Sequence, residues 1–340
     1  MEKAFFHEKM MRQALRLAEK ARGFTAPNPV VGAVIVKNGK IIGSGWHHKA
    51  GCPHAEIEAI RSAGKKNLKG ADLYVTLEPC CTSGRTPPCT GAIIEAGFSR
   101  VFAGCSDPNE KHAGRGFQVL RNAGIEVKTG ILEKLCIESN RAFFHFITNG
   151  IPFVILKMAS TLDGKTATAC GNSQWITSEK ARGRVQKLRR NSDAILIGAG
   201  TFRKDSPSLT VRTPAGKLLR TPLRFIATGH PEKLNPPDGW ECVDLRSEDA
   251  WKNFLRELGK RGVMQLLIEG GGELAASALN AGIVDEIEFH YAPKILGGAG
   301  SHTVCDGKNP VSLSEAIPVT GMKLFRCGTD FIVSGKPVYH

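Results

Sequence analysis

The residues best suited to chemistry lie in the first third of the sequence. His54 and Glu56 stand two residues apart, and Cys80 and Cys89 follow further along the chain. One imidazole and two thiolates fill three positions of a tetrahedral zinc ion and leave the fourth open for water, as a catalytic site requires. Zinc lowers the pKa of bound water to about 7, and a nearby carboxylate that is not a ligand must move protons. We therefore predict that His54, Cys80 and Cys89 bind Zn2+ and that Glu56 is catalytic.

The spacing of the cysteines leaves a second interpretation open. A His-x-Glu segment followed by Pro-Cys and a second cysteine is the signature of zinc deaminases, in which two residues commonly separate the cysteines. Here eight residues separate Cys80 from Cys89, and Cys81 adjoins the first of them. Adjacent side chains usually point apart, and Cys89 precedes a predicted helix that favours a thiolate, so we select Cys80 and Cys89. The alternative is a structural zinc site with Cys81 as the fourth ligand.

A second group of residues is suited to binding phosphate. Glu269-Gly270-Gly271-Gly272-Glu273 follows a predicted strand and opens a predicted helix. Glycines at such a turn let a phosphate approach the backbone amides of a helix N-terminus. The spacing is not that of the Rossmann dinucleotide fingerprint, and by itself a purely structural turn is equally compatible with it.

Charge and composition restrict the class of ligand. The formal net charge of +14 is compatible with nucleic-acid binding, but the excess of Lys and Arg is spread over both halves and forms no basic tail. A distributed positive field also suits small phosphorylated substrates. We therefore expect a small-molecule partner and no nucleic acid.

The cysteines and the length of the apolar runs indicate in which cellular compartment the protein resides. Residues 1–22 form the pattern of an amphipathic helix rather than a secretory segment, and no apolar run approaches the ~20 residues of a membrane span. We therefore expect a cytoplasmic protein without membrane contact, in which thiols stay reduced and clustered cysteines are better read as metal ligands than as disulfides.

The elements that must position these residues alternate between strands and helices. In the first half we predict strands at 30–36, 41–46, 72–77, 101–104 and 125–127 and helices near 54–63, 90–96, 116–122 and 132–146. In the second half we predict strands at 152–158, 194–198, 223–227, 265–269 and 286–291 and helices near 179–188, 249–258 and 273–280. This alternation predicts an α/β protein with helices on the faces of its sheets. Turn residues at 149–152 place a domain boundary there, giving domains 1–148 and 149–340.

Longer motifs in both halves resemble one enzyme family, the bifunctional deaminase/reductases of riboflavin biosynthesis. In the first half the resemblance rests on segments 27–34, 54–56, 76–80, 84–89, 107–109 and 113–116, and in that family the longer gap between the cysteines is usual. In the second half it rests on 157–165, 175–177, 192–198, 200–201, 205–212 and 269–271. The two sets cover nearly the whole chain in the order of the family.

The resemblance implies a cytidine-deaminase-like three-layer domain followed by a dihydrofolate-reductase-like α/β domain. The implied reactions are zinc-dependent deamination of 2,5-diamino-6-ribosylamino-4(3H)-pyrimidinone 5′-phosphate and NADPH-dependent reduction of the ribosyl group of the deaminated product to ribityl. It also implies a homo-oligomer. Asn28 resembles a residue that orients the pyrimidine ring, although a turn residue before Pro29 would look the same.

In the reductase half the resemblance implies two sets of binding residues. The residues that match NADPH-contacting positions are Ala159, Trp175, Thr201, Asp205, Gly271 and Gly272. The residues that match substrate-contacting positions are Ser173, Arg189, Ser208, Arg212 and Glu269. An arginine fork binds phosphate through two hydrogen bonds, although Arg189 also fits a solvated helix face among its basic neighbours. Glu269 and Asp205 are candidates for the acid of the reduction, and Lys157 for a residue that places substrate or cofactor.

Three rival interpretations remain at this point. A deaminase of nucleic acid explains His54 and Glu56 but nothing after residue 151. A non-catalytic zinc protein with a nucleotide-binding regulatory half predicts bound zinc without release of ammonia. A working deaminase joined to an inactive reductase predicts ammonia release without oxidation of NADPH.

Overall fold

The computed structural model of the chain describes residues 2–82, 87–110, 112–213, 215–307 and 311–339. Residues 84–86 of the first-half motif therefore lie outside the described residues. The chain divides into two compact units, Met1–Gly150 and Ile151–His340. Among the described helices, none has both the length and the apolar character that crossing a bilayer requires.

The first unit is built around a mixed five-stranded sheet in the order β2-β1-β3-β4-β5. Its strands are β1 (Gly32–Lys37), β2 (Lys40–Trp46), β3 (Asp72–Leu77), β4 (Arg100–Cys105) and β5 (Glu126–Lys128). Asn38 and Gly39 have positive φ values and make the hairpin that joins β1 to β2. β3, β4 and β5 run parallel, so their carboxyl ends share one edge of the sheet.

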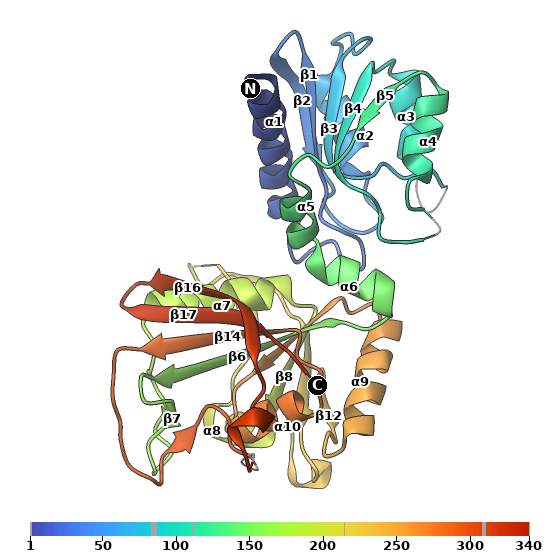
Figure 1. Ribbon diagram of the computed structural model, residues 1–340. Coiled ribbons are helices and arrows are strands. Elements are labelled where there is room, and N and C mark those ends of the chain that lie inside the picture. Colours follow the sequence, from blue (N-terminus) through green and yellow to red (C-terminus); the bar gives the residue numbers. More distant parts are fainter. Residues whose placement is uncertain (1, 83–86, 111, 214, 308–310, 340) are drawn as a thin grey trace. The chain divides into compact units, whose positions relative to one another are not determined.

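Helices cover both faces of this sheet and make three layers (Figure 1). The helices are α1 (Glu2–Ala18), the 3-10 turn η1 (Glu19–Ala21), α2 (Ala55–Ala63), α3 (Cys89–Glu95), α4 (Arg115–Asn122), α5 (Glu133–Ser139) and α6 (Arg141–Asn149). Alternate strand residues such as Ile35 and Val75 pack against α2, α3 and α4. α1 contacts β1 and β3 on the other side.

The helix predicted at 132–146 is wrong in one respect, because the structure has two helices that meet at Asn140. Asn140 leaves the helical conformation with φ −115°. Its buried side-chain amide accepts a hydrogen bond from Val30 N–H and donates one to Val30 O, both at 2.9 Å. A contact with a residue 110 positions earlier in the chain therefore breaks the helix.

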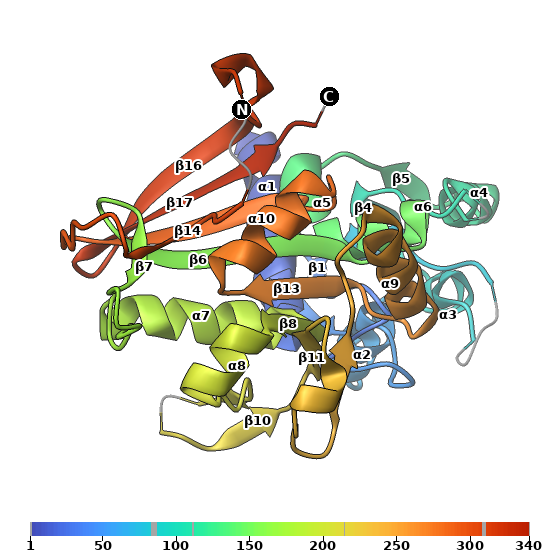
Figure 2. The same cartoon turned by 90° about the horizontal axis from the view of Figure 1, so that it is seen from below.

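The second unit contains an eight-stranded sheet in the order β12-β11-β8-β13-β6-β14-β17-β16 (Figure 2). Its strands are β6 (Phe153–Thr161), β8 (Ala194–Gly198), β11 (Leu223–Ala227), β12 (Trp240–Val243), β13 (Gln265–Glu269), β14 (Glu286–Ala292), β16 (Val319–Cys327) and β17 (Asp330–Pro337). The first six strands in the sheet order are parallel, and β17 is antiparallel to both β14 and β16. Short strands make two further pairs, β7 (Lys165–Ala167) with β15 (His302–Thr303) and β9 (Val211–Arg212) with β10 (Leu218–Arg220).

Helices flank this sheet as well. They are α7 (Glu179–Asn191), α8 (Ala199–Asp205), α9 (Glu248–Lys260) and α10 (Gly272–Asn280), with 3-10 turns η2 (Pro231–Lys233) and η3 (Leu313–Glu315). α9 and α10 contribute Trp251, Leu255 and Ala275 to a core that includes Leu156 and Leu266. α7 lies on the other side of the strands from α10 (Figure 1). The parallel strands end at one edge, where open α/β sheets usually bind ligands.

Candidate active sites

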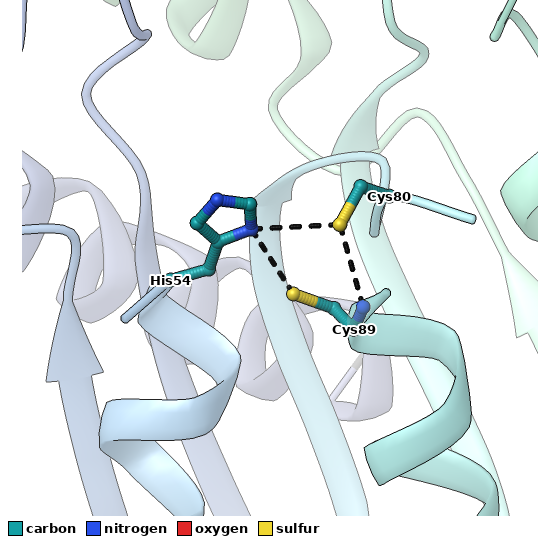
Figure 3. Close-up of side chains that lie close together, drawn as sticks. All are labelled: His54, Cys80 and Cys89. Atoms are coloured by element: carbon teal, nitrogen blue, oxygen red, sulfur yellow. Dashed lines mark hydrogen bonds between the residues drawn. The ribbon is translucent and has the colours of Figure 1, made fainter. Parts of the chain in front are cut away.

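The three predicted metal ligands come together from separate elements of the first unit. His54 is the residue before α2, Cys80 follows the end of β3, and Cys89 is the first residue of α3. His54 Nδ1 lies 3.2 Å from Cys89 Sγ and 3.5 Å from Cys80 Sγ (Figure 3). The backbone N–H of Cys89 donates to Cys80 Sγ at 3.3 Å. The three donor atoms therefore face a common point.

This geometry fits a zinc ion. Ligands held at about 2.0–2.3 Å in tetrahedral directions lie roughly 3.5 Å from one another. Within the described part of the chain, these three residues form the one group of three or more His, Cys, Asp or Glu side chains that could hold a metal ion, and their donor atoms all lie within 4.8 Å of one another. Cys81 is not a member of the group. One nitrogen and two sulfur donors leave one tetrahedral position free for solvent.

The pKa values of the two thiols are shifted in opposite directions. Hydrogen bonds from Cys89 and from His54 lower the pKa of Cys80 to about 4 even though burial opposes this. The same contact with Cys80, together with burial, raises the pKa of Cys89. One thiolate is therefore ready at neutral pH, and release of the second proton would accompany metal binding.

Glu56 lies in the first turn of α2, next to the metal ligands. Its side chain is only 3% exposed. Burial raises its pKa to about 7, and the neighbouring Cys80 adds to the shift. A carboxyl group with a pKa near neutrality can both take up and release a proton during catalysis.

Asn28 makes a contact that the sequence did not predict. Its Nδ2 lies 3.0 Å from His47 Nε2, and His47 Nδ1 lies 3.1 Å from Pro53 O. A carbonyl oxygen only accepts, so His47 carries its proton on Nδ1 and accepts from the Asn28 amide through Nε2. Burial lowers the pKa of His47, which favours this neutral form. His47 also packs edge-on against His54, with ring centroids 5.3 Å apart. His47 is therefore a functional candidate that only the three-dimensional contact reveals.

A cavity of about 960 Å3 lies in the second unit and collects most of the predicted reductase residues. Those that line it are Ala159, Ser173, Trp175, Arg189, Thr201, Asp205, Ser208, Glu269 and Gly271. They come from β6, α7, α8, β13 and the loops between them. The volume is within the range of about 300–1,000 Å3 of ordinary ligand pockets.

Two predicted residues are absent from the lining that the structure describes. Arg212 donates to Thr210 Oγ1 and to Gly216 O, both at 3.1 Å. Gly272 is in contact with the loop that contains Thr303 and Asp306, whose atoms occupy the space that a Cβ would need. Arg212 and Gly272 therefore lie beside the cavity rather than in its lining, since Thr210 also contacts Ser208 at 3.1 Å and Gly272 adjoins Gly271.

The turn after β13 consists of two glycines that lead directly into a helix. Gly270 and Gly271 have φ values of +73° and +81°, a region that favours glycine. Gly271 is followed directly by α10, whose first-turn N–H groups have no partner within the helix. Thr201 Oγ1 lies near both glycines. These features fit the diphosphate of a nucleotide cofactor.

Arg189 and Glu269 face each other inside the cavity. Arg189 Nε and Nη2 donate to the two carboxylate oxygens of Glu269 at 2.7 and 2.8 Å. Their side chains are 18% and 10% exposed, which excludes a fully solvated helix face for Arg189. Lys157, on β6 beside Glu269, also lines the cavity. Burial lowers the pKa of Lys157, although the charge of Glu269 opposes the shift.

Basic side chains that the sequence did not predict as site residues complete the lining. The Arg182 guanidinium lies 4.6 Å from the centre of the Trp175 ring. Lys204 and Arg246 also border the cavity. They occur among many surface cations, so their residue types alone carried no signal.

Fold and sites together define a class: a two-domain enzyme with the ligand set of a hydrolytic zinc centre in one unit and a separate ligand-binding cavity in the other. Residues 5–105 match the cytidine and deoxycytidylate deaminase zinc-binding region, and residues 152–333 match the RibD C-terminal domain. The chain belongs to the RibD family of bifunctional deaminase/reductases of riboflavin biosynthesis. The sequence prediction of this family and of the two domain folds is thereby confirmed.

Several full-length relatives support this membership. The riboflavin biosynthesis protein RibD of Aquifex aeolicus is 42% identical, with 96% of this chain and 97% of the relative covered. RibD of Bacillus amyloliquefaciens is 40% identical, with 97% and 96% covered. The crystal structure of a diaminohydroxyphosphoribosylaminopyrimidine deaminase/5-amino-6-(5-phosphoribosylamino)uracil reductase from Thermotoga maritima has a TM-score of 0.87 at 38% identity, covering 99% of this chain and 100% of that chain.

Proposed function

We propose that residues 1–148 deaminate 2,5-diamino-6-ribosylamino-4(3H)-pyrimidinone 5′-phosphate and that residues 149–340 reduce the resulting 5-amino-6-(5-phosphoribosylamino)uracil with NADPH. The Thermotoga maritima relative carries both activities in its name. The observation that carries the deaminase half is the buried carboxyl of Glu56 beside three donor atoms of the right number and kind for catalytic zinc.

In the deaminase site, His54, Cys80 and Cys89 would hold zinc, which supplies a water that is acidic enough to react at neutral pH. Glu56 would take a proton from the attacking water and give it to the amine nitrogen, while the oxygen bonds to the ring carbon and the carbon–nitrogen bond breaks to release ammonia. Because the pKa of Glu56 is about 7, both directions of transfer are accessible at neutral pH. Asn28 would orient the pyrimidine ring, and the hydrogen bond that fixes its amide against His47 supports this role.

In the reductase site, the turn at Gly270 and Gly271 would receive the diphosphate of NADPH, which supplies the hydride. Reduction adds this hydride to C1′ of the ribosylamino group, breaks the bond from C1′ to the ring oxygen, and gives that oxygen a proton. The charge of Arg189 and its two hydrogen bonds outweigh burial and hold the pKa of Glu269 below its usual value. We therefore assign Glu269 as the anion that positions Arg189 and Lys157, and Lys157, whose pKa is lowered by burial and which lines the same cavity, as the proton donor.

The two halves are tested by measuring ammonia release and NADPH oxidation in wild type and in Glu56→Gln. The variant should lose about 100-fold or more in deamination, since positioned acid–base groups typically contribute 10²–10⁴-fold. It should still reduce the deaminated intermediate and retain zinc. Glu58→Gln, two residues along the same helix and paired with Arg61 at 3.3 Å, is the matched control and should remain active. Normal deamination by Glu56→Gln would overturn the role of Glu56.

A further inference from the structure

Glu78 is a buried acid of the first unit that the mechanism above does not use. Its side chain is 6% exposed, and it stands between the last residue of β3 and the metal ligand Cys80. Its backbone N–H donates to Cys105 O at 3.0 Å and so extends the pairing of β3 with β4. The side chain therefore starts where the carboxyl ends of two parallel strands meet.

Both carboxylate oxygens of Glu78 accept backbone hydrogen bonds from one loop. Glu78 Oε2 accepts from Asp107 N–H at 3.1 Å and from Gly114 N–H at 2.9 Å, and Oε1 accepts from Gly116 N–H at 2.9 Å. Asp107 and Gly114 lie near the start and at the end of the segment that joins β4 to α4, and Gly116 lies in the first turn of α4. The single carboxylate of Glu78 thus links Asp107, which follows β4, with Gly114 and Gly116 at the start of α4.

Two of the residues that donate to Glu78 are glycines, and the backbone conformation or the close packing at each of them favours glycine. Gly114 has a φ value of +76°, which favours glycine. A Cβ at Gly116 would overlap the carbonyl oxygen of Pro79, the residue just before Cys80. The loop therefore packs directly on the turn that presents a metal ligand.

The loop also brings a polar group towards the metal centre. Asp107 is half-buried, accepts a hydrogen bond from Asn109 N–H at 2.8 Å, and lies within electrostatic range of Cys80 and Glu78. The two acidic side chains are joined by backbone hydrogen bonds, since Asp107 N–H donates to Glu78 and Asn109 N–H donates to Asp107.

We propose that Glu78 is a positioning residue of the deaminase, which clamps residues 106–110 and 112–116 against the metal-ligand turn and thereby fixes the polar wall of the substrate site. This role rests on the proposed deamination by the first unit. It assigns to the glutamate of the segment Glu78-Pro79-Cys80 a task separate from metal binding, because its oxygens point to the loop amides and not to the ligands.

Replacement of Glu78 by Gln tests the clamp. One acceptor oxygen becomes an NH2 donor that faces backbone donors, so part of the loop must detach. We expect kcat/KM for deamination to fall about 100-fold, the scale expected for a displacement of about 1 Å at a reacting centre. Zinc content and reduction of the deaminated intermediate should be unchanged. Amide hydrogen exchange at Asp107, Gly114 and Gly116 should accelerate, a readout that does not depend on activity.

Two further variants make the result decisive. Glu95→Gln removes an exposed carboxylate at the end of α3 and should leave both activities and loop exchange unchanged. Gly116→Ala leaves Glu78 intact but forces the loop away from Pro79, and it should reproduce the loss of deamination with zinc retained.

The outcomes separate this proposal from the proposed function. If wild type releases no ammonia from the diaminopyrimidinone phosphate, the proposed function fails. If wild type is active and Glu78→Gln deaminates within about twofold of it, the clamp is refuted. Loss of zinc from Glu78→Gln, or loss of the folded first unit in both Glu78→Gln and Gly116→Ala, would assign Glu78 to metal binding or folding and would overturn the proposal as well.

Discussion

Because Arg189 and Glu269 form a mostly buried ion pair, replacing Glu269 by the uncharged Gln should strongly lower the stability of the second unit. Glu269→Gln leaves the guanidinium of Arg189 and the ammonium of Lys157 without their shared counter-charge in a mostly buried site. Removing one partner of a buried pair costs about 3–5 kcal/mol. Because Gln keeps one acceptor oxygen for Arg189, we expect the lower end, about 3 kcal/mol.

The structure provides a matched control in the same unit. Arg261 binds Glu241 with the same two-pronged geometry, at 2.9 and 2.8 Å. That pair is much more open, with side chains 32% and 50% exposed. Exposed pairs are worth about 0–1 kcal/mol, so Glu241→Gln should have little effect.

Hydrogen exchange followed by mass spectrometry can measure both variants in the strands concerned. A loss of about 3 kcal/mol corresponds to roughly 100-fold faster exchange in β13, since every 1.4 kcal/mol is tenfold. The pKa of Glu269 is lowered in the folded state, so its contribution is present above the unfolded pKa of about 4.3 and is lost as the pH falls through the folded value. The difference between Glu269→Gln and wild type should therefore shrink in acid. Equal effects of Glu269→Gln and Glu241→Gln at pH 7 would refute the reasoning.

Three other outcomes follow from the first unit. Asn140→Ala should destabilise it by about 2–3 kcal/mol in urea unfolding, because Val30 N–H and C=O lose their buried partners; a change below about 0.5 kcal/mol would contradict this. Gly45→Ala should weaken zinc binding in competition with a chelator, because the added Cβ overlaps the backbone of α2 at Ala59, whereas Gly91→Ala meets no atom within 4 Å and should bind normally. Removing zinc with a chelator should abolish ammonia release but leave NADPH oxidation on the deaminated intermediate, and parallel loss of both would contradict separate sites.

The fold was predictable where local pattern and tertiary environment agree. The strand at 72–77 was predicted with its observed bounds, because the five residues after Asp72 are apolar or β-prone and all six are buried. The hairpin at Asn38-Gly39 follows from the positive φ values that these two residues tolerate. In contrast, β16 was missed: none of its nine residues from Val319 to Cys327 is buried, seven of them are exposed, and charged residues interrupt its apolar pattern.

The site residues were also predictable only in part. His54, Cys80 and Cys89 were found because their residue types are rare and their purpose is narrow. The links from His47 to Asn28 and from Arg189 to Glu269 were not found, since each joins residues whose types are common and whose proximity is created only by folding.

Both sites obey one rule that connects sequence with function. Cys80 follows β3, Asp107 follows β4, and the turn at Gly270 and Gly271 follows β13. Side chains and backbone groups just past the end of a parallel strand meet at one edge of a sheet, where helices that start there offer free N–H groups to anions and thiolates. A short polar or glycine-rich segment after an apolar strand is therefore the strongest local indication of function in this chain. Glu78 shows that this rule alone does not identify a residue's role. It lies in such a segment, yet its carboxylate binds the backbone of the neighbouring loop. Only its hydrogen bonds distinguish a positioning residue from a metal ligand.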